Sequence, residues 1–278
     1  MARTPTRASA RTSTPAQPRT HHRRRELSQN FLTTTTAAPA RLVRAARPHP
    51  NRLLLEVGAG KGALTEVLAP LVRELWAYEI DARLLPGLRT RFAGAAGVRV
   101  VGGDFLAARP PREPFAVVGN VPFSRTAAIV DWCLHAPALT DATLITQLEY
   151  ARKRTGDYGR WSKLTVLHWP WLSWALHGRV GRREFRPVPR VDAGILRIER
   201  RARPLLPPGE AAAYRRLVEV GFRGVGGSVH ASLCREGYAA SRLDRGFRAA
   251  GLDRSVVVAH VPPEAWLALH RSLKGSAY

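Results

Sequence analysis

Cysteine and long apolar runs are scarce in this chain of 278 residues, and each scarcity excludes a class of protein. The two cysteines, Cys133 and Cys234, stand far apart without paired spacing, which argues against a disulfide framework or a zinc site and fits a reduced setting. No run approaches the roughly 18–20 apolar residues of a membrane helix. The N-terminus also lacks the apolar segment of a secretory signal. We therefore expect a cytoplasmic protein with no metal site and no membrane partner.

Acidic residues are few as well. The chain has 21 Asp and Glu against 44 Lys and Arg, nearly all of them arginine, for a formal net charge of +23. A small acidic substrate does not require so much positive charge, whereas a polyanion is attracted by it. Nucleic acid is therefore the first candidate partner. A basic protein without a specific polyanion partner is the alternative.

Composition divides the chain into three parts. Residues 1–25 are rich in Arg, Thr, Ser, Ala and Pro and have almost nothing apolar to bury, which predicts a disordered basic arm. Residues 26–203 alternate apolar strand-like runs with helical patterns. Residues 204–278 begin within a proline-rich linker and then show helical patterns only, which predicts a small all-helical domain.

The middle part predicts an α/β fold. Strands are expected at Leu53–Val57, Glu74–Glu79, Val98–Val101, Phe115–Val118, Ala142–Gln147, Trp171–His177 and Ala193–Ile198. The first five are near-continuous apolar strands separated by helices, which is typical of a parallel sheet that is covered on both faces. Before the first strand, a helix capped within 33–36 is expected to carry Leu42 and Val43 on its apolar face. The prolines of Phe185–Arg190 predict a stretch without regular structure.

The turn after the first strand carries three glycines at alternate positions, Gly58, Gly60 and Gly62. Glycine lets a ligand lie close to the backbone, and the helix N-terminus that follows favours a nucleotide or nucleoside. A dinucleotide site needs Gly-x-Gly-x-x-Gly, whereas here the third glycine comes one residue early. A P-loop needs Gly-Lys-Ser/Thr, whereas Lys61 is followed by Gly62. Both nucleotide interpretations are weakened, and S-adenosylmethionine is the best ligand that is left.

A glycine or a polar residue stands at the carboxyl end of each of the first four strands: Gly58, Glu79, Asp104 and Asn120. In an open parallel sheet, ligands bind along this edge. Glu79 comes about 20 residues after the glycines, the usual place for a carboxylate that accepts both ribose hydroxyls and disfavours a ribose phosphate. Asp104 can accept a hydrogen bond from an adenine amine. Each residue alone could be a cap or turn former, but together they predict an adenosine site.

The fourth strand end, Asn120-Val121-Pro122-Phe123, suggests the reaction. An adenine N6 amine is a poor nucleophile, because its lone pair is delocalised into the ring. The Asn120 side-chain oxygen and the Val121 carbonyl could accept its two hydrogens, while Phe123 stacks on a base swung out of its helix. Asn120 and Phe123 are therefore the predicted catalytic residues. A strand-ending turn with a core aromatic is the alternative interpretation.

Five motifs occur in the order and spacing of the ribosomal RNA adenine N6-methyltransferases, a family that the chain resembles from about residue 26 to 200. They are Ser28-Gln29-Asn30-Phe31-Leu32, Glu56–Gly62, Glu79-Ile80-Asp81, Gly103-Asp104-Phe105 and Asn120-Val121-Pro122-Phe123. The resemblance implies a Rossmann-like, S-adenosylmethionine-dependent methyltransferase domain over 26–203 and an RNA-contacting helical domain over 204–278. It also implies that the cofactor is bound by Asn30, Leu32, Gly58, Glu79, Asp104 and Asn120.

Two branches of this family compete. One dimethylates adjacent adenines of small-subunit rRNA, whereas the Erm branch modifies one adenine in the peptidyl-transferase region of 23S rRNA and so confers macrolide–lincosamide–streptogramin B resistance. The segments Glu149–Arg154 and Trp169–Trp171 and the arginine-rich arm resemble Erm proteins of actinomycetes. The resemblance thus implies a monomeric enzyme that acts on 23S rRNA before full ribosome assembly. The family usually has tyrosine where this chain has Phe123, so the number of methyl groups added stays open.

Two functions outside these branches are also open. A non-catalytic RNA-binding or ribosome-assembly factor could use the same scaffold, and a DNA adenine methyltransferase would usually have Asn-Pro-Pro-Tyr/Phe at the last motif. Basic pairs and triplets are interpreted as phosphate contacts or as solvated surface: Arg23–Arg25, Arg152–Arg154, Arg182-Arg183 and Arg200-Arg201. The expected core and domain-junction residues, rather than base platforms, are Trp161, Trp169, Trp171 and Trp174.

Overall fold

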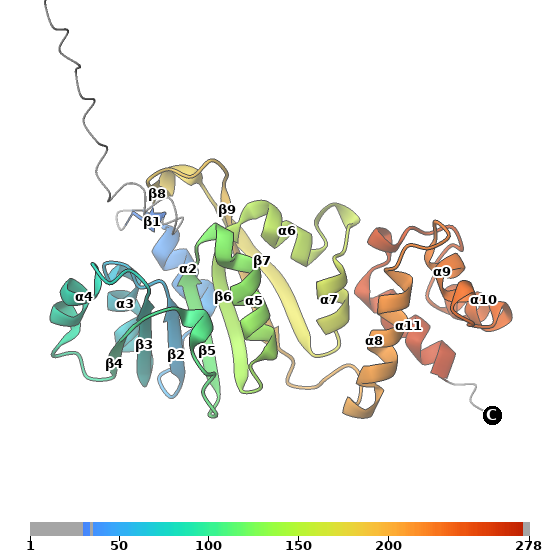
Figure 1. The fold of residues 1–278 in the computed structure, drawn as a ribbon, viewed down its shortest axis with the longest axis horizontal. Coiled ribbons are helices and arrows are strands. Elements are labelled where there is room, and N and C mark those ends of the chain that lie inside the picture. The colour runs from blue at the N-terminus through green and yellow to red at the C-terminus, as the bar shows by residue number, and fades with distance from the viewer. Residues whose placement is uncertain (1–29, 34–35, 275–278) are drawn as a thin grey trace, which may run out of the picture.

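The computed structural model describes residues 30–33 and 36–274 (Figure 1). The arm predicted at 1–25 and the Ser28-Gln29 part of the first motif lie outside these residues. Within them, a seven-stranded sheet is flanked by helices, and a further group of helices forms the C-terminal end. No helix of the described part is long and apolar enough to cross a membrane.

The main sheet has the strand order β4-β3-β2-β5-β6-β9-β7. Its strands are β2 (Leu53–Val57), β3 (Glu74–Glu79), β4 (Val98–Gly102), β5 (Phe115–Asn120), β6 (Leu139–Gln147), β7 (Leu172–Val180) and β9 (Ala193–Arg200). Every strand predicted from the sequence is present, and only the bounds differ. The strands from β4 to β6 run parallel, as predicted, so their carboxyl ends share one edge.

The parallel arrangement predicted for the first five strands does not extend to β9. Strand β9 pairs antiparallel with both β6 and β7. A parallel pair needs a crossover connection, usually a helix, to bring the chain back to the same end of the sheet. Between β7 and β9 the chain forms only η5 (Arg182–Glu184) and β8 (Phe185–Arg186), so β9 returns in the opposite direction. The apolar runs indicated burial on both faces, which does not determine strand direction.

Helices cover both faces of the sheet (Figure 1). The flanking helices are α2 (Ala38–Ala46), α3 (Ala63–Leu68), α4 (Leu85–Phe92), α5 (Thr126–His135), α6 (Leu148–Thr155) and α7 (Lys163–His168). Helices α2 and α3 pack against one face, and α5 and α6 pack against the other. Each face therefore has its own buried cluster, as the near-continuous apolar strands require.

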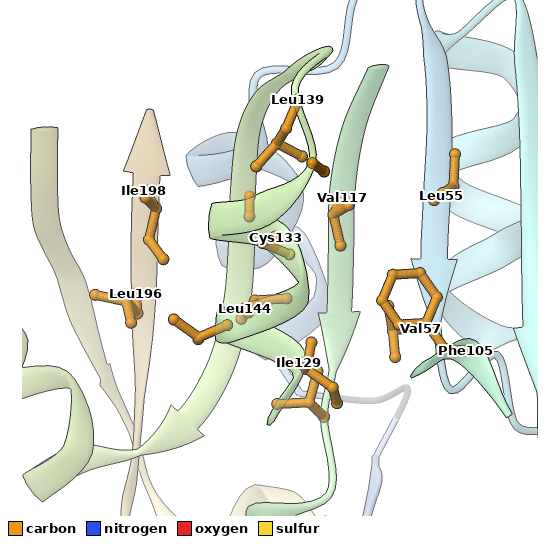
Figure 2. Close-up of a cluster of buried hydrophobic side chains, with 14 of the residues drawn as sticks. Leu55, Val57, Phe105, Val117, Ile129, Cys133, Leu139, Leu144, Leu196 and Ile198 are labelled. Atoms are coloured by element: carbon orange, nitrogen blue, oxygen red, sulfur yellow. The ribbon is translucent and has the colours of Figure 1, made fainter. Parts of the chain in front are cut away.

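Alternate residues of each strand serve the two clusters, because successive side chains of a strand point to opposite faces. Leu55 and Val117 belong to the cluster beneath α5, together with Ile129 and Cys133 of that helix (Figure 2). The neighbouring residue Leu54 belongs to the cluster beneath α2 and α3. This packing holds the strands in register and so sets the relative positions of their carboxyl ends.

A separate two-stranded sheet joins the N-terminal motif to the connection between β7 and β9. Strand β1 (Phe31–Leu32) pairs antiparallel with β8 (Phe185–Arg186). The prediction that Phe185–Arg190 lacks regular structure is therefore wrong for its first two residues. The first proline is Pro187, so the two preceding residues keep amides that can pair with another strand. The pairing holds Asn30, which precedes β1, at the carboxyl edge of the main sheet.

Two helices differ from the sequence pattern. Helix α2 has Ala37 as its N-cap and no side-chain capping bond, so the cap predicted within 33–36 is wrong. Pro39 in the first turn supports the start of this helix instead, because its fixed φ suits that position. Helix α6 has little sequence signal of its own. Only Ala151 among its residues is buried, so the helix lacks an apolar stripe.

The described chain beyond the linker contains four α-helices that surround a further buried cluster, to which Val166 of α7 also belongs. They are α8 (Ala211–Gly221), α9 (Val229–Arg235), α10 (Ala240–Ala249) and α11 (Pro263–Lys274). Trp161, Trp169 and Trp171 pack against this cluster from the α6–β7 segment, and Trp174 lies in the sheet core. These tryptophans occupy the core and junction positions that the sequence predicted for them.

Candidate active site

A pocket lies at the carboxyl edge of the parallel strands. The predicted site residues that line it are Asn30, Gly58, Glu79, Asp104, Asn120 and Phe123. Leu32 does not line the pocket, because its half-buried side chain packs against the cluster beneath α2. Its contact with a cofactor stays a prediction. Residues from five separate segments of the chain therefore meet in one cavity.

The glycine turn after β2 has left-handed backbone at Gly58 (φ +77°) and Gly60 (φ +60°). A Cβ atom on Gly60 would lie 3.1 Å from the ring of Phe31, and one on Gly58 would lie 3.6 Å from the Asn120 carbonyl oxygen. The contact at Gly58 would be an ordinary one, whereas the contact at Gly60 would be tight, so Gly60 lets the Phe31 ring of β1 approach the turn. The sequence predicted that these glycines admit a ligand, and the structure shows that Gly60 also admits the protein's own chain.

The Glu79 carboxylate at the end of β3 holds the glycine turn. Only 3% of this residue is exposed; its Oε2 accepts a hydrogen bond from the Gly60 amide at 2.7 Å, and its Oε1 accepts one from the Asp81 amide at 2.7 Å. Burial raises the pKa of Glu79, and the backbone hydrogen bonds lower it in part. A carboxylate oxygen has room for more than one hydrogen bond. Glu79 can therefore support the turn and still accept ribose hydroxyls.

The Asp104 carboxylate lies just beyond the end of β4 and has two partners. Its Oδ1 accepts a hydrogen bond from the Leu106 amide at 3.0 Å, and its Oδ2 pairs with the Arg125 guanidinium at 2.5 Å. Arg125 follows the Asn120–Phe123 motif by two residues and lines the same pocket. Arg125 is not predictable from the sequence, because its partner lies on another loop and no local pattern marks the pair. The ion pair joins the predicted catalytic loop to the predicted adenine-binding carboxylate.

The Asn120 side chain is oriented by the N-terminal segment. Its Nδ2 donates a hydrogen bond to the Asn30 backbone carbonyl at 2.6 Å. The amide group has one donor nitrogen and one acceptor oxygen, so this bond leaves Oδ1 as the atom that can accept a hydrogen. Phe123 lines the same pocket and meets the Phe185 ring edge to face, with the ring centroids 6.5 Å apart. An amide oxygen and an aromatic ring are thus held together at the end of β5.

The rest of the lining is mostly apolar. It includes Phe31, Ile80, Phe105, Leu106, Val121 and Ile129. Ile80 is 43% exposed although it directly follows the buried Glu79. Its place beside a polar strand-end residue is the signal that could have marked it as a ligand contact. Apolar walls with two carboxylates at their edge suit a flat, uncharged base joined to a ribose, as in adenosine.

A second carboxylate, Glu56, is buried beneath the glycine turn. It is 1% exposed and accepts a hydrogen bond from the Thr65 hydroxyl at 2.6 Å. Burial is the main cause that raises its pKa, to about 7; the Thr65 bond lowers the pKa, and the charge of Glu79 raises it further. The folded protein therefore keeps a proton on Glu56 in a pH range where the unfolded chain has lost it.

Because the pKa of Glu56 is raised, we expect the free energy of unfolding to depend on pH. Between its ordinary pKa of 4.5 and about 7, the folded state binds more protons than the unfolded state, so the free energy of unfolding should fall as the pH rises. Glu56→Gln keeps an acceptor for Thr65 and removes the titration. We expect the variant to be more stable than the wild type at pH 8, by up to about 3 kcal/mol, and to gain much less at pH 5.

Urea unfolding of both proteins at the two pH values measures this difference. The Glu219→Gln variant is the control, because Glu219 is exposed in α8 and water stabilises the charge of an exposed carboxylate. An equal effect of Glu56→Gln at pH 5 and at pH 8 would contradict the buried, protonated carboxyl.

The comparisons with known proteins agree with this geometry. The family model described as ribosomal RNA adenine dimethylase matches residues 20–274. The chain belongs to this family. An rRNA adenine N-6-methyltransferase of Streptomyces fradiae is 65% identical over 253 residues, which cover 90% of this chain and 79% of that protein. The mycinamicin-resistance protein MyrB of Micromonospora griseorubida is 36% identical, over 89% of this chain and 78% of its own length.

A solved structure extends the match to the whole fold. The crystal structure of the 23S rRNA methyltransferase ErmE superposes with a TM-score of 0.85 at 48% identity, over 88% of this chain and 99% of that one. Family membership confirms three predictions from the sequence: the Rossmann-like methyltransferase fold, the enzyme class and the cofactor S-adenosylmethionine. The lining of the pocket fits this cofactor, since it offers the two carboxylates of Glu79 and Asp104 and apolar walls.

Proposed function

We propose that this family member transfers a methyl group from S-adenosylmethionine to N6 of one adenine in the peptidyl-transferase region of 23S rRNA. The modification would confer resistance to macrolides, lincosamides and streptogramin B. The observation that carries the proposal is that Asn120 and Phe123 share one pocket with Glu79 and Asp104. The ends of β3 and β4, with Glu79 and Asp104, are suited to hold the adenosine of the methyl donor. The end of β5 offers an amide oxygen and an aromatic ring to a second base.

The chemistry follows from the groups at the end of β5. Asn120 Oδ1 and the Val121 carbonyl accept the two N6 hydrogens of the target adenine, which draws the nitrogen towards tetrahedral geometry and frees its lone pair. Phe123 stacks on the base after it has left its helix. The nitrogen attacks the methyl carbon as the carbon–sulfur bond breaks, and one N6 proton then leaves to solvent. The enzyme contributes mainly position, with the reacting atoms about 3–3.5 Å apart.

The relatives support 23S rRNA as the substrate. The named target of the 48% identical structure is 23S rRNA, and a 36% identical relative is named for resistance to a macrolide, mycinamicin. A resistance methylation in the peptidyl-transferase region requires access to RNA that is buried in the finished ribosome. The enzyme is therefore proposed to act before ribosome assembly is complete. The proposal also includes that it is cytoplasmic and monomeric.

The proposal also assigns tasks to the three parts of the chain. The catalytic domain spans 26–203, the helical part over 204–278 contacts RNA, and the basic arm over 1–25 adds contacts to phosphates. Among the described residues, the basic segments Arg152–Arg154, Arg182-Arg183 and Arg200-Arg201 are the proposed phosphate contacts of the first two parts.

Transfer of labelled methyl groups to isolated rRNAs tests this function. We expect label in 23S rRNA and, by mass spectrometry of the modified fragment, one adenine with one or two methyl groups. Label in small-subunit rRNA alone would move the chain to the other branch of the family. Tight binding of rRNA without any transfer would identify a non-catalytic assembly factor, and label in duplex DNA would identify a DNA enzyme.

A further inference from the structure

The loop between α6 and α7 exposes an aromatic side chain that the proposed methyl transfer does not use. Tyr158 lies in η4 (Asp157–Gly159) and is 74% exposed. Its backbone is left-handed, with φ +58° and ψ +25°. An aromatic residue rarely adopts this conformation, which costs free energy and persists only where the surroundings impose it. Such residues gather at sites of ligand binding, so the position of this ring needs a reason.

The surroundings hold the loop in place. Gly156 and Gly159, on either side of Tyr158, are also left-handed, with φ +74° and φ +66°. A Cβ atom on Gly156 would lie 2.3 Å from the Trp161 ring, so the turn closes directly on this tryptophan. The Trp161 amide in turn donates a hydrogen bond to the Ala259 carbonyl at 2.8 Å. The loop is therefore anchored to the C-terminal helices, and the Tyr158 ring is presented by a preformed turn.

Arg152 fixes the ring itself. Its Nη1 donates a hydrogen bond to the Tyr158 hydroxyl at 3.0 Å, and its guanidinium carbon lies 5.4 Å from the ring centroid. Arg152 also pairs with Asp157 at 2.8 Å, which keeps the guanidinium in this position. The cation–π contact covers part of the ring, yet the side chain remains largely open to solvent. The same segment, residues 149–163, carries the exposed cations Lys153, Arg160 and Lys163 and the exposed carboxylate Glu149.

The loop lies at the edge of the sheet that carries the active site. Helix α6 begins immediately after β6, and the neighbouring strand β5 ends in Asn120, which pairs with Ile145 of β6. An eight-residue helix spans about 12 Å, so the loop begins within roughly that distance of the end of β6. In Figure 1, α6 and the loop to α7 lie at the same end of the sheet as β1 and β8. RNA bound at the active site would pass close to this loop.

We propose that Tyr158 is a stacking platform for an unpaired base of the substrate RNA that flanks the target adenine. This inference rests on the proposed function and adds a binding site to it. Aromatic rings bind unstacked bases of any sequence, since every base has a π face, and neighbouring cations hold the phosphates. Tyr158 has the features that suit such a platform. Its ring is exposed, a preformed turn presents it, the Arg152 guanidinium packs against it, and the surrounding segment has a net positive charge.

Variants of Tyr158 test the platform in the full-length protein. Asparagine tolerates left-handed backbone, so Tyr158→Asn removes the ring while the turn is kept. We expect it to raise the Kd for a 23S rRNA fragment of the peptidyl-transferase region about tenfold. The kcat at saturating RNA and the Kd for S-adenosylhomocysteine should not change. Tyr158→Phe keeps the stacking face and should bind within about twofold of the wild type.

Two controls separate stacking from a structural role. Stacking releases no counterions, so the slope of log Kd against log salt should be the same for Tyr158→Asn and the wild type. Leu71→Ala removes an exposed apolar side chain far from the active-site edge and should leave RNA binding unchanged. A Tyr158→Asn protein that also binds S-adenosylhomocysteine more weakly, or that melts at a lower temperature in proportion, would indicate a structural role and overturn the proposal.

A scan with abasic nucleotides then identifies the base. Removal of the stacked base should weaken binding of the wild type about tenfold and leave Tyr158→Asn unaffected, because the same contact is already lost. If no position shows this coupling, or if Tyr158→Asn binds RNA as well as the wild type, the platform is wrong. A coupled position in a protein that methylates no rRNA would instead retain the platform and refute the proposed function.

Discussion

Asn120→Ala should reduce the kcat for methyl transfer by about 100- to 1,000-fold. The variant removes Oδ1, the acceptor proposed for one N6 hydrogen, so the lone pair of the target amine stays delocalised in the ring. It also removes the donor that binds the Asn30 carbonyl at 2.6 Å, so the segment before β1 loses its tie to β5. Single-turnover transfer of labelled methyl groups to 23S rRNA measures the effect on the chemical step.

The same variant should keep measurable cofactor binding, because Glu79 and Asp104 are unchanged. Titration with S-adenosylhomocysteine provides that comparison. Asn51→Ala is a matched control, since Asn51 is exposed in the turn before β2 at the opposite edge of the sheet. A rate for Asn120→Ala near that of the wild type would refute the catalytic assignment. Loss of rate together with loss of all cofactor binding would assign Asn120 to the cofactor site alone.

Glu79→Ala should raise the Kd for the cofactor by at least about 100-fold, which corresponds to roughly 2.7 kcal/mol. Two backbone amides, those of Gly60 and Asp81, lose their acceptor, and hydrogen bonds to a charged group contribute about 1.5–3 kcal/mol each. The glycine turn loses its support, and the proposed bonds to the ribose hydroxyls are lost with it. Isothermal titration with S-adenosylhomocysteine measures the Kd.

Glu79→Ala removes both the support of the glycine turn and the proposed bonds to the ribose hydroxyls. A ligand without the ribose 2′-hydroxyl separates these two effects. Replacement of S-adenosylhomocysteine by its 2′-deoxy form should weaken binding to the wild type and change little for Glu79→Ala, because that carboxylate is already absent. Glu113→Ala serves as control, since Glu113 is exposed and pairs only with Arg73 among the described residues. An unchanged Kd for Glu79→Ala would remove the ribose-binding role.

The strand ends were predictable because they follow from local pattern and one rule of topology. Apolar runs marked the strands, and each run stopped at a residue with a distinct chemical task, such as Glu79 or Asn120. The carboxyl ends of neighbouring parallel strands share one edge of a sheet, so the sequence alone placed these residues together. Both line the pocket in the structure, although nothing but the spacing of the strands links them along the chain.

Contacts between loops that are distant in the chain could not be predicted from the sequence. Arg125 pairs with Asp104 across two loops, and Phe31 packs against Gly60 because β1 pairs with β8, about 150 residues later in the chain. Neither contact leaves a periodic signal, since each depends on where separate segments end in space. The antiparallel direction of β9 escaped prediction for a related reason, because burial on both faces is compatible with either direction.

The sequence by itself determined the chemistry of this protein: a glycine turn, two carboxylates and an Asn-Val-Pro-Phe motif at successive strand ends, with a basic surface suited to RNA. Such features are local, so short stretches of residues suffice to specify them. The tertiary structure decided how these groups are oriented, with Asn120 held by the Asn30 carbonyl and Glu79 committed to two backbone amides. It also decided which surface residues share the active-site edge, Tyr158 among them, because orientation and proximity arise only when distant segments pack together.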